Sequence, residues 1–379
     1  MNSAILHPLI ALLAAPVVLS AWMAQKRGPQ AENAVLFIID GLSYKAPERL
    51  SLKNLQALIA GGAYCAKSYN ILPAHPTTGV WAKYHQSSIP NPVILAGTLL
   101  LRTDQEYVQH SFYPARITAH AANDIAYSRL NVGFNLSFLH GSDDRPVHDD
   151  QTMAWAIEFL RRARPAFMKV HLQDTGTAGW FLGQETNPSG PRRKSIWADG
   201  SPYCQAALRA DQYLGTFLDE LKALGLTEKT VLFVTADHGQ ADAGGHPFDD
   251  EDAWAMPLVL AGPGIRPGQR LEYAEQIDIV PTLCHLMGVK PPKNADGRIL
   301  AEALTDPPAG VPPRRQRIKE LNTLLCEGDA LFKKLRREAA AERDYFGLER
   351  ILEWHRFGSI EKLITHNRSV LRKLSKESK

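Results

Sequence analysis

Three largely apolar runs in the sequence each end in an aspartate. They are AVLFIID, FMKVHLQD and VLFVTAD, which end at Asp40, Asp174 and Asp237. Runs of this kind are typical of parallel strands that are buried on both faces. A fourth run, MPLVLAGPGI at residues 256–265, is closed by glycine and proline. We therefore predict a buried, mainly parallel sheet with acids at the carboxyl ends of three strands.

Segments with helical spacing of apolar residues lie between these runs. They cover residues 48–60, 151–163 and 204–224, and the first and last of them stop at glycine. Strands that alternate with helices predict a three-layer α/β/α sandwich with helices on both faces of the sheet. Ligands of open α/β sheets bind at the carboxyl ends of the strands. The three strand-end acids are therefore predicted to converge on a cation.

The N-terminal stretch at residues 4–24 is apolar, and its length suits a signal peptide or a short membrane span. Lys26 and Arg27 follow the stretch rather than precede it. That order is unusual for a signal peptide, and it favours a cytoplasmic C-terminal side. An N-terminal helix packed on the body is the alternative. We expect residues 1–30 to be a signal peptide or N-terminal membrane segment, and the protein to be exported or membrane-anchored, with possible membrane association through this end.

The rest of the chain divides into a main domain, residues 31–305, and a C-terminal extension, residues 306–379. The extension opens with prolines and then becomes strongly charged. Ile318, Leu321 and Leu325 recur in it at helical spacing. We predict an amphipathic helical appendage that lies on the main domain or on a partner.

Charge and cysteine content exclude two classes of site. A net charge of +3 over 379 residues gives no dense basic face for nucleic acid. The four cysteines are scattered and form no CxxC pair, so a thiolate zinc site is disfavoured. Disulfides and free thiols both fit the cysteine pattern, and nothing in the sequence indicates the oligomeric state.

The segment VTADHGQADAGGH carries the strongest indication of chemistry. Asp237 and His238 stand together at a strand end, and His246 follows eight residues after His238. Carboxylate oxygen and imidazole nitrogen together suit Zn²⁺ or Mn²⁺ better than Ca²⁺. With Asp40 and Asp174, these residues predict a metal centre.

In these motifs the chain resembles the alkaline phosphatase superfamily, especially its phosphodiesterase and nucleotide pyrophosphatase branch and the phosphoethanolamine transferases, with sulfatases as relatives. The resemblance spans roughly residues 34–290. The matching blocks are FIIDGL at 37–42, SSIPNPVILAG at 87–97, HLQDTGTAGW at 171–180, and the segment from DHG to GPG at 237–264. The resemblance implies an alkaline phosphatase-like fold with the nucleophile held beside a metal.

Carried over to this sequence, the family pattern implies two metal positions. Asp40, Asp237 and His238 would hold one ion together with the nucleophile oxygen, and Asp174 and His246 would hold a second. The cofactor is then one or two Zn²⁺ ions, with Mn²⁺ as the alternative. The third block departs from the pattern, because Trp180 stands near the place of a family histidine and indole does not bind metal. A one-metal enzyme is therefore also open, and His171 is a candidate for supporting the site.

The same pattern makes Ser88 the expected nucleophile and Asn91 the residue that binds a phosphate oxygen. Ser87, Thr77 and Thr78 remain alternatives for the nucleophile. A metal-bound serine can attack phosphorus or sulfur because coordination lowers the pKa of its hydroxyl. The sulfatase signature, in which Pro is followed two residues later by Arg, is only half present, because Pro92 occupies the Arg position.

The sequence thus favours a metal-dependent phosphoric or sulfuric ester hydrolase, of phosphodiesterase or phosphatase type. Its substrate would be a small-molecule or lipid-linked ester. Two alternatives stay open. One is a phosphoethanolamine or phosphoglycerol transferase. The other is a binding protein with an impaired catalytic site and a partial metal site.

Overall fold

The computed structural model describes residues 29–72, 85, 87–88, 106–123, 131–139, 148–184, 195–293, 295–335 and 359–377. Its centre is a nine-stranded sheet. The strands are β1 (Asn33–Ile39), β2 (Ala63–Tyr69), β3 (Thr118–Ala122), β4 (Leu136–Leu139), β5 (Phe167–Leu172), β6 (Thr230–Thr235), β7 (Ala255–Ala261), β8 (Gln269–Leu271) and β9 (Ala274–Glu275).

The sheet is mainly parallel, as predicted. Its order is β4-β3-β5-β1-β6-β7-β2-β8, and β9 pairs with β2. Every neighbouring pair is parallel except the two that involve β7, which runs antiparallel to both β6 and β2. β1 lies between β5 and β6, so the carboxyl ends of these three parallel strands meet at one edge of the sheet.

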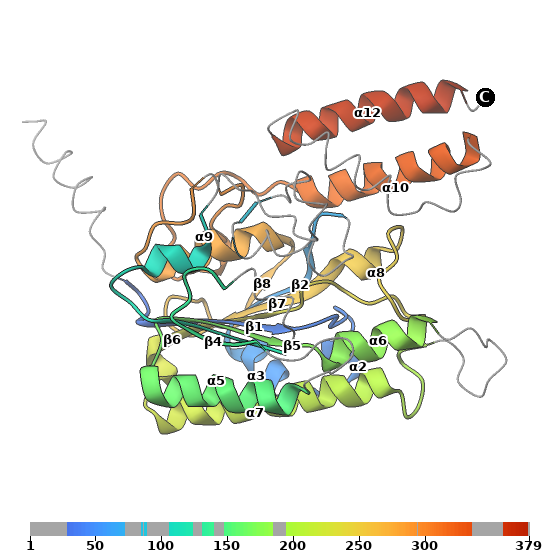
Figure 1. The fold of residues 1–379 in the computed structure, drawn as a ribbon. Coiled ribbons are helices and arrows are strands. Elements are labelled where there is room, and N and C mark those ends of the chain that lie inside the picture. Colours follow the sequence, from blue (N-terminus) through green and yellow to red (C-terminus); the bar gives the residue numbers. More distant parts are fainter. Residues whose placement is uncertain are drawn as a thin grey trace, which may run out of the picture.

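One face of the sheet is covered by the helices that the sequence predicts. They are α3 (Lys53–Gly61), α5 (Asp149–Ala163) and α7 (Pro202–Ala223), which lie below the sheet in Figure 1. The segment expected as one helix at 48–60 is two, because the backbone becomes extended at Leu50, between α2 (Ala46–Arg49) and α3. An apolar core fills the space between this helical layer and the sheet.

The other face is covered by shorter elements and by α9 (Ile279–Leu286) (Figure 1). Apolar residues of α9 share a core with alternate side chains of β1 and β6 and with Phe167 of β5. The remaining short elements are η3 (Val108–Phe112), η5 (Thr227–Lys229), α8 (Glu251–Trp254), η6 (Gln276–Asp278) and η7 (Ala301–Ala303). The result is the expected α/β/α arrangement.

The residues of the C-terminal part that the structure describes include the helices α10 (Arg317–Leu335) and α12 (Ile360–Glu377), which lie side by side (Figure 1). Ile318, Leu321 and Leu325 of α10 are buried, as their spacing predicts. They share an apolar cluster with β2 and with the segment around Trp254 and Tyr273. Leu363 and Ile364 of α12 complete that cluster, so the helical extension lies on the main domain.

The N-terminal stretch, residues 1–28, lies outside the described residues. Among the helices that the structure describes, none is long and apolar enough to cross a bilayer. All four cysteines are free thiols. The cysteine pattern, which left disulfides open, therefore reflects side chains that pack as thiols.

Candidate active site

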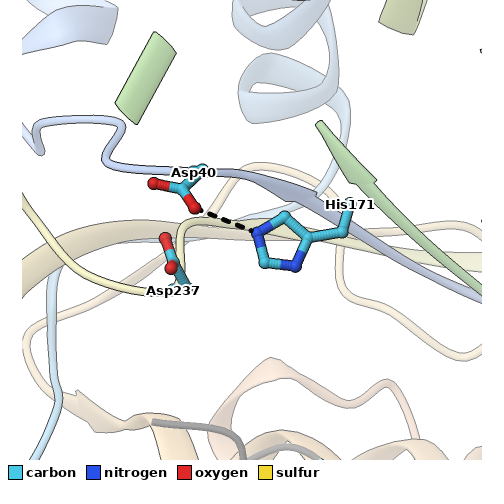
Figure 2. A group of neighbouring side chains, drawn as sticks. All are labelled: Asp40, His171 and Asp237. Carbon is cyan, nitrogen blue, oxygen red and sulfur yellow. Dashed lines mark hydrogen bonds and ion pairs between the residues drawn. The ribbon is translucent and has the colours of Figure 1, made fainter. Parts of the chain in front are cut away.

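Two acids and one histidine meet where β1, β5 and β6 end. Asp40 directly follows β1, and Asp237 follows β6 by two residues. His171 lies in β5, in register with Ile38 of β1. Ligand atoms of Asp40, His171 and Asp237 all lie within 4.8 Å of one another, and all three side chains are buried (Figure 2). The parallel register brings these residues together, because side chains at paired positions leave the sheet on the same face.

His238 extends this group. Its Nε2 lies 3.5 Å from Asp40 Oδ1 and 3.6 Å from Asp237 Oδ2. Its Nδ1 lies 2.8 Å from the carbonyl oxygen of Gly239, to which it donates a hydrogen bond. When Nδ1 donates in this way, the Nε2 lone pair points toward the two acids, which is the arrangement that orients a metal ligand. On the other side of the acids, His171 Nε2 lies 3.3 Å from Asp40 Oδ2.

The donors fit a metal ion. Asp237 Oδ1 accepts hydrogen bonds from Gly41 N and His238 N, whereas its buried Oδ2 accepts none from the described residues. Burial, together with the nearby Lys169, lowers the pKa of His171 to about 3, so this imidazole is neutral. Two buried carboxylates beside the neutral imidazole of His171 favour a bound cation. Oxygen and nitrogen donors in this number suit Zn²⁺ or Mn²⁺.

Two glycines allow the chain to close tightly around Asp40. Gly41 has a φ of +62°, and its N–H points to Asp237. Gly176 lies in the first turn of α6 (Asp174–Gln184), and a Cβ added there would lie 1.8 Å from Asp40 Oδ1. The first turn of α6 therefore packs directly on the carboxylate of Asp40. This contact explains the glycine that follows Asp174 in the third sequence motif.

Asp174 and His246, which the family pattern assigns to a second metal, do not join the group of Asp40, His171 and Asp237. Asp174 begins α6, and its Oδ1 lies 3.4 Å from Nδ1 of His148. Its backbone N–H donates to Asp149, a carboxyl whose pKa burial raises to about 7. Asp174 thus faces the first turn of α5 rather than the acids at the strand ends.

His246 lies between two rings. Its ring centroid is 4.1 Å from that of His238 and 5.2 Å from that of Trp180, and the planes of His246 and Trp180 differ by 25°. Trp180, which is 36% exposed, forms the outer layer of this stack. The residue that replaces a family histidine in the sequence therefore contacts His246 directly, as a stacking partner.

The two serine candidates have different surroundings. Ser87 adopts a left-handed φ of +55°, and its Oγ donates to Ile277 O at 2.6 Å and accepts from Gly297 N at 3.2 Å. Ser88 is fully buried, and its Oγ has no hydrogen-bond partner among the described residues. Ser87 is therefore engaged in holding its loop, whereas the hydroxyl of Ser88 is available. Outside the described residues lie Thr77, Thr78 and Asn91.

A buried basic group next to the acids was missed by the sequence analysis. Lys169 is fully buried on β5, and its Nζ donates to His85 Nε2 at 3.0 Å. His120 of β3 is in register with Lys169, and its ring centroid lies 6.2 Å from that of His85. Burial lowers the pKa of Lys169 to about 7 and lowers the pKa values of His85 and His120 well below the usual range. The alternation of Lys169 and His171 in an otherwise apolar strand was the available signal.

Comparison with known proteins places the chain in a family. The model of the family "Sulfatase" matches residues 100–289, half of the chain. An ulvan-active sulfatase of Formosa agariphila is 30% identical over 114 residues, which are 28% of this chain and 22% of that protein. The multifunctional alkaline phosphatase superfamily protein PehA of Trinickia caryophylli is 26% identical over 38% of this chain and 29% of its own length. The chain thus matches less than a third of the length of these curated relatives.

Solved structures share the fold at low sequence identity. A phosphonate monoester hydrolase from Silicibacter pomeroyi aligns with a TM-score of 0.56 at 19% identity, over 75% of this chain and 78% of its own. A 2-O GAG sulfatase aligns with a TM-score of 0.59 at 16% identity, over 75% and 76%. These likenesses support the alkaline phosphatase-like fold. With the family match over half of its length, the chain belongs to the sulfatase family of the alkaline phosphatase superfamily.

Proposed function

We propose that this protein is a metal-dependent hydrolase of phosphoric or sulfuric esters, with Ser88 as its nucleophile. The observation that carries the proposal is the buried group of Asp40, His171 and Asp237, with His238 against both acids. Burying two carboxylates close together is unfavourable, and packing alone does not offset the loss of their hydration. Their position at the carboxyl ends of parallel strands is the usual place for a ligand in such a sheet.

The proposed reaction begins with attack by Ser88 Oγ on phosphorus or sulfur. Oγ loses its proton as it bonds to that atom, the bond to the leaving oxygen breaks, and that oxygen departs protonated as an alcohol. Water then hydrolyses the ester on Ser88 and returns a proton to Oγ. A bound cation supplies the lowering of the hydroxyl pKa that a serine needs near neutral pH. Ser88 suits this role because its Oγ has no structural hydrogen bond among the described residues, unlike that of Ser87.

Lys169 and His85 supply the positive side of the proposed site. Lys169 is on the same strand face as His171, and His85 lies three residues before Ser88. An ammonium group in a buried site stabilises the negative charge of an ester strongly, because little water is present to screen it. We assign Lys169 to charge stabilisation of the bound ester, with His85 Nε2 holding its ammonium in place.

The proposed centre holds one ion rather than two. His246 stacks between His238 and Trp180, and Asp174 contacts His148 and Asp149. These contacts engage both residues that a second metal would need. Zn²⁺, with Mn²⁺ as an alternative, fits the carboxylate and imidazole donors of the first position.

Phosphoric esters are the favoured substrates. A serine that is converted to formylglycine, the sulfatase nucleophile, would need arginine where this chain has Pro92. A serine that keeps its hydroxyl is the phosphatase and phosphodiesterase arrangement that the sequence motifs resemble. The ester would be a small molecule or a lipid-linked group.

The test is turnover of chromogenic esters by the purified, zinc- or manganese-loaded protein, without an added acceptor. We expect hydrolysis of an aryl phosphodiester or phosphomonoester to exceed that of the aryl sulfate. Ser88→Ala should lower kcat at least about a hundredfold. Ser87→Ala is the matched comparison, because its Oγ holds the loop that carries Ser88 but does not attack. It should lower thermal stability and lower kcat per folded molecule by no more than about tenfold, well short of the loss in Ser88→Ala.

Three outcomes separate the alternatives. Turnover that appears only when an alcohol acceptor is added would favour the phosphoethanolamine or phosphoglycerol transferase. Metal binding without turnover of any ester would favour the impaired binding protein. A Ser88→Ala variant with unchanged kcat would remove Ser88 from the proposal.

A further inference from the structure

The first turn of α10 is joined to the loop that carries the proposed nucleophile. Arg317 donates to the carboxylate of Glu275 at 2.7 Å and to the carbonyl oxygen of Asp296 at 3.3 Å. The backbone N–H of Asp296 donates to the carbonyl oxygen of Ser87 at 2.7 Å. The path from α10 to the neighbour of Ser88 therefore passes through a single intermediate residue.

A second path leads from α10 to the metal-site acid. Asn322 is fully buried, its Nδ2 donates to Asn70 O at 2.6 Å, and its Oδ1 accepts from Leu72 N at 3.0 Å. Asn70 is also fully buried, and its Nδ2 donates to the backbone carbonyl of Asp237. Asn322 thus fixes two backbone groups after β2, and Asn70 fixes the backbone carbonyl of Asp237.

The stretch of α10 between these two paths is rigidly supported. Ile318 and Leu321 are buried against β2 and Trp254, and α12 covers the other side of the same cluster. Arg317 and Asn322 are five residues apart, about 7.5 Å along a helix. Buried hydrogen bonds in an apolar setting hold their partners firmly, because any alternative leaves a polar group unpaired. α10 therefore holds in place both the segment after β2 and the loop that contains Ser87.

We propose that α10 is a positioning element of the active site, in which Asn322 sets the metal-binding acid and Arg317 sets the nucleophile loop. The inference rests on the proposed function, since it assigns a role to residues outside the metal group. It also makes the C-terminal helices part of the catalytic unit rather than an appendage. The two residues act on different steps: Asn322, through Asn70, on metal affinity, and Arg317, through Asp296, on the attack by Ser88.

The test combines Asn322→Ala, Asn70→Ala, the double variant and Arg317→Ala in the full chain, with Thr323→Ala as the control. Thr323 is an exposed neighbour on α10, and its hydroxyl donates to Lys319 O of its own helix at 3.0 Å. The readouts are Zn²⁺ affinity by calorimetry, melting temperature in chelator, and kcat and KM with an aryl phosphodiester.

We expect Asn322→Ala and Asn70→Ala each to weaken Zn²⁺ binding about tenfold or more, on the scale of residues that support metal ligands. The double variant should be no worse than the poorer single variant, because both residues belong to one path. Arg317→Ala should keep Zn²⁺ affinity within about twofold and lower kcat about tenfold at unchanged KM. Thr323→Ala should change none of these values.

The inference is overturned if the variants lower only the melting temperature, with Zn²⁺ affinity and kcat per folded molecule at the level of the unmodified protein. Additive losses of Zn²⁺ affinity in the double variant would also overturn the path through Asn70. Failure of the proposed function is a separate result, because the unmodified protein would then bind no Zn²⁺ or hydrolyse no ester.

Discussion

The expected metal site has two halves, which lie on different kinds of secondary structure: Asp40 and Asp237 form the first half, and Asp174 and His246 form the second. Asp40 and Asp237 follow strands of the sheet directly, and the register of β1 with β5 and β6 brings them beside His171. Asp174 begins a helix. His246 lies in a loop, and its ring contacts the rings of Trp180 and His238. The first half forms a compact buried group, whereas the second is divided among other partners.

In this molecule the acids that follow strands converge, whereas the acid that begins a helix contacts other partners. Strands in a parallel sheet have one register when both faces are buried, because a slip of one residue would move every side chain to the opposite face. The direction of Asp174 depends instead on how α6 packs. That packing is set by close contacts such as the one between Gly176 and Asp40.

The largest effect is expected from a substitution in the half of the site at the strand ends. Asp237→Asn should lower kcat about a thousandfold and abolish tight Zn²⁺ binding, because it removes one of two charged ligands. Asp174→Asn is the matched substitution in the other half, and we expect kcat within about tenfold of the unmodified enzyme. The measurement is steady-state hydrolysis of an aryl phosphodiester at saturating metal. Equal losses in the two variants would mean that Asp174 is a ligand.

The next effect concerns the contact that joins the halves. Gly176→Ala would place a methyl group 1.8 Å from Asp40 Oδ1, so α6 must move. We expect a loss of about 3 kcal/mol in the free energy of unfolding, at the upper end for overpacked sites. Gly61→Ala at the end of α3 is the control, since nothing lies within 4 Å of a Cβ there. Denaturant unfolding of both variants measures the difference, and similar stabilities would show that α6 does not rest on Asp40.

Metal removal separates the two halves by stability. A ligand that binds only the folded protein stabilises it by mass action, so Zn²⁺ at about a hundred times its dissociation constant should stabilise the fold by about 2.7 kcal/mol. The same stabilisation should persist in His246→Ala to within about 0.5 kcal/mol, if His246 is not a ligand. Thermal unfolding with and without chelator gives both values. A His246→Ala protein that no longer responds to Zn²⁺ would return His246 to the metal site.

The smallest effect restores the family residue. Trp180→His places an imidazole where the superfamily pattern has one, next to His246. Because Asp174 remains held by His148 and the first turn of α5, we expect no additional tightly bound metal. The rate should change by less than about threefold. Metal analysis of the purified variant checks this, and a gain of one equivalent would show that Trp180 alone had excluded the second ion.

Much of the fold was predictable because buried parallel strands have an unmistakable pattern. The runs that became β1, β5, β6 and β7 were all identified, and the acids after β1 and β6 meet as expected. β3 and β4 escaped prediction because they are short and their sequences, TAHAA and LSFL, have little apolar periodicity. The antiparallel direction of β7 depends on its neighbours in space and leaves no local signal.

The sequence predicted the site residues that lie in a motif at a strand end, such as Asp40 and Asp237. It did not predict those that tertiary packing brings in. His171 was expected to support the site and in fact belongs to the acid group itself. Lys169 and His85 come together from positions 84 residues apart, which no local pattern reveals. The ties from α10 through Asn322 and Asn70 likewise depend on tertiary packing, because each asparagine alone resembles an ordinary polar residue.

The central claim is that the acids at the strand ends form a single metal centre. Calorimetric titration of the metal-free protein with Zn²⁺, repeated on Asp237→Asn and Asp174→Asn, tests it most directly. A single centre predicts about one equivalent for the unmodified protein, none for Asp237→Asn and about one for Asp174→Asn. Two equivalents in the unmodified protein, one of them lost in Asp174→Asn, would contradict it.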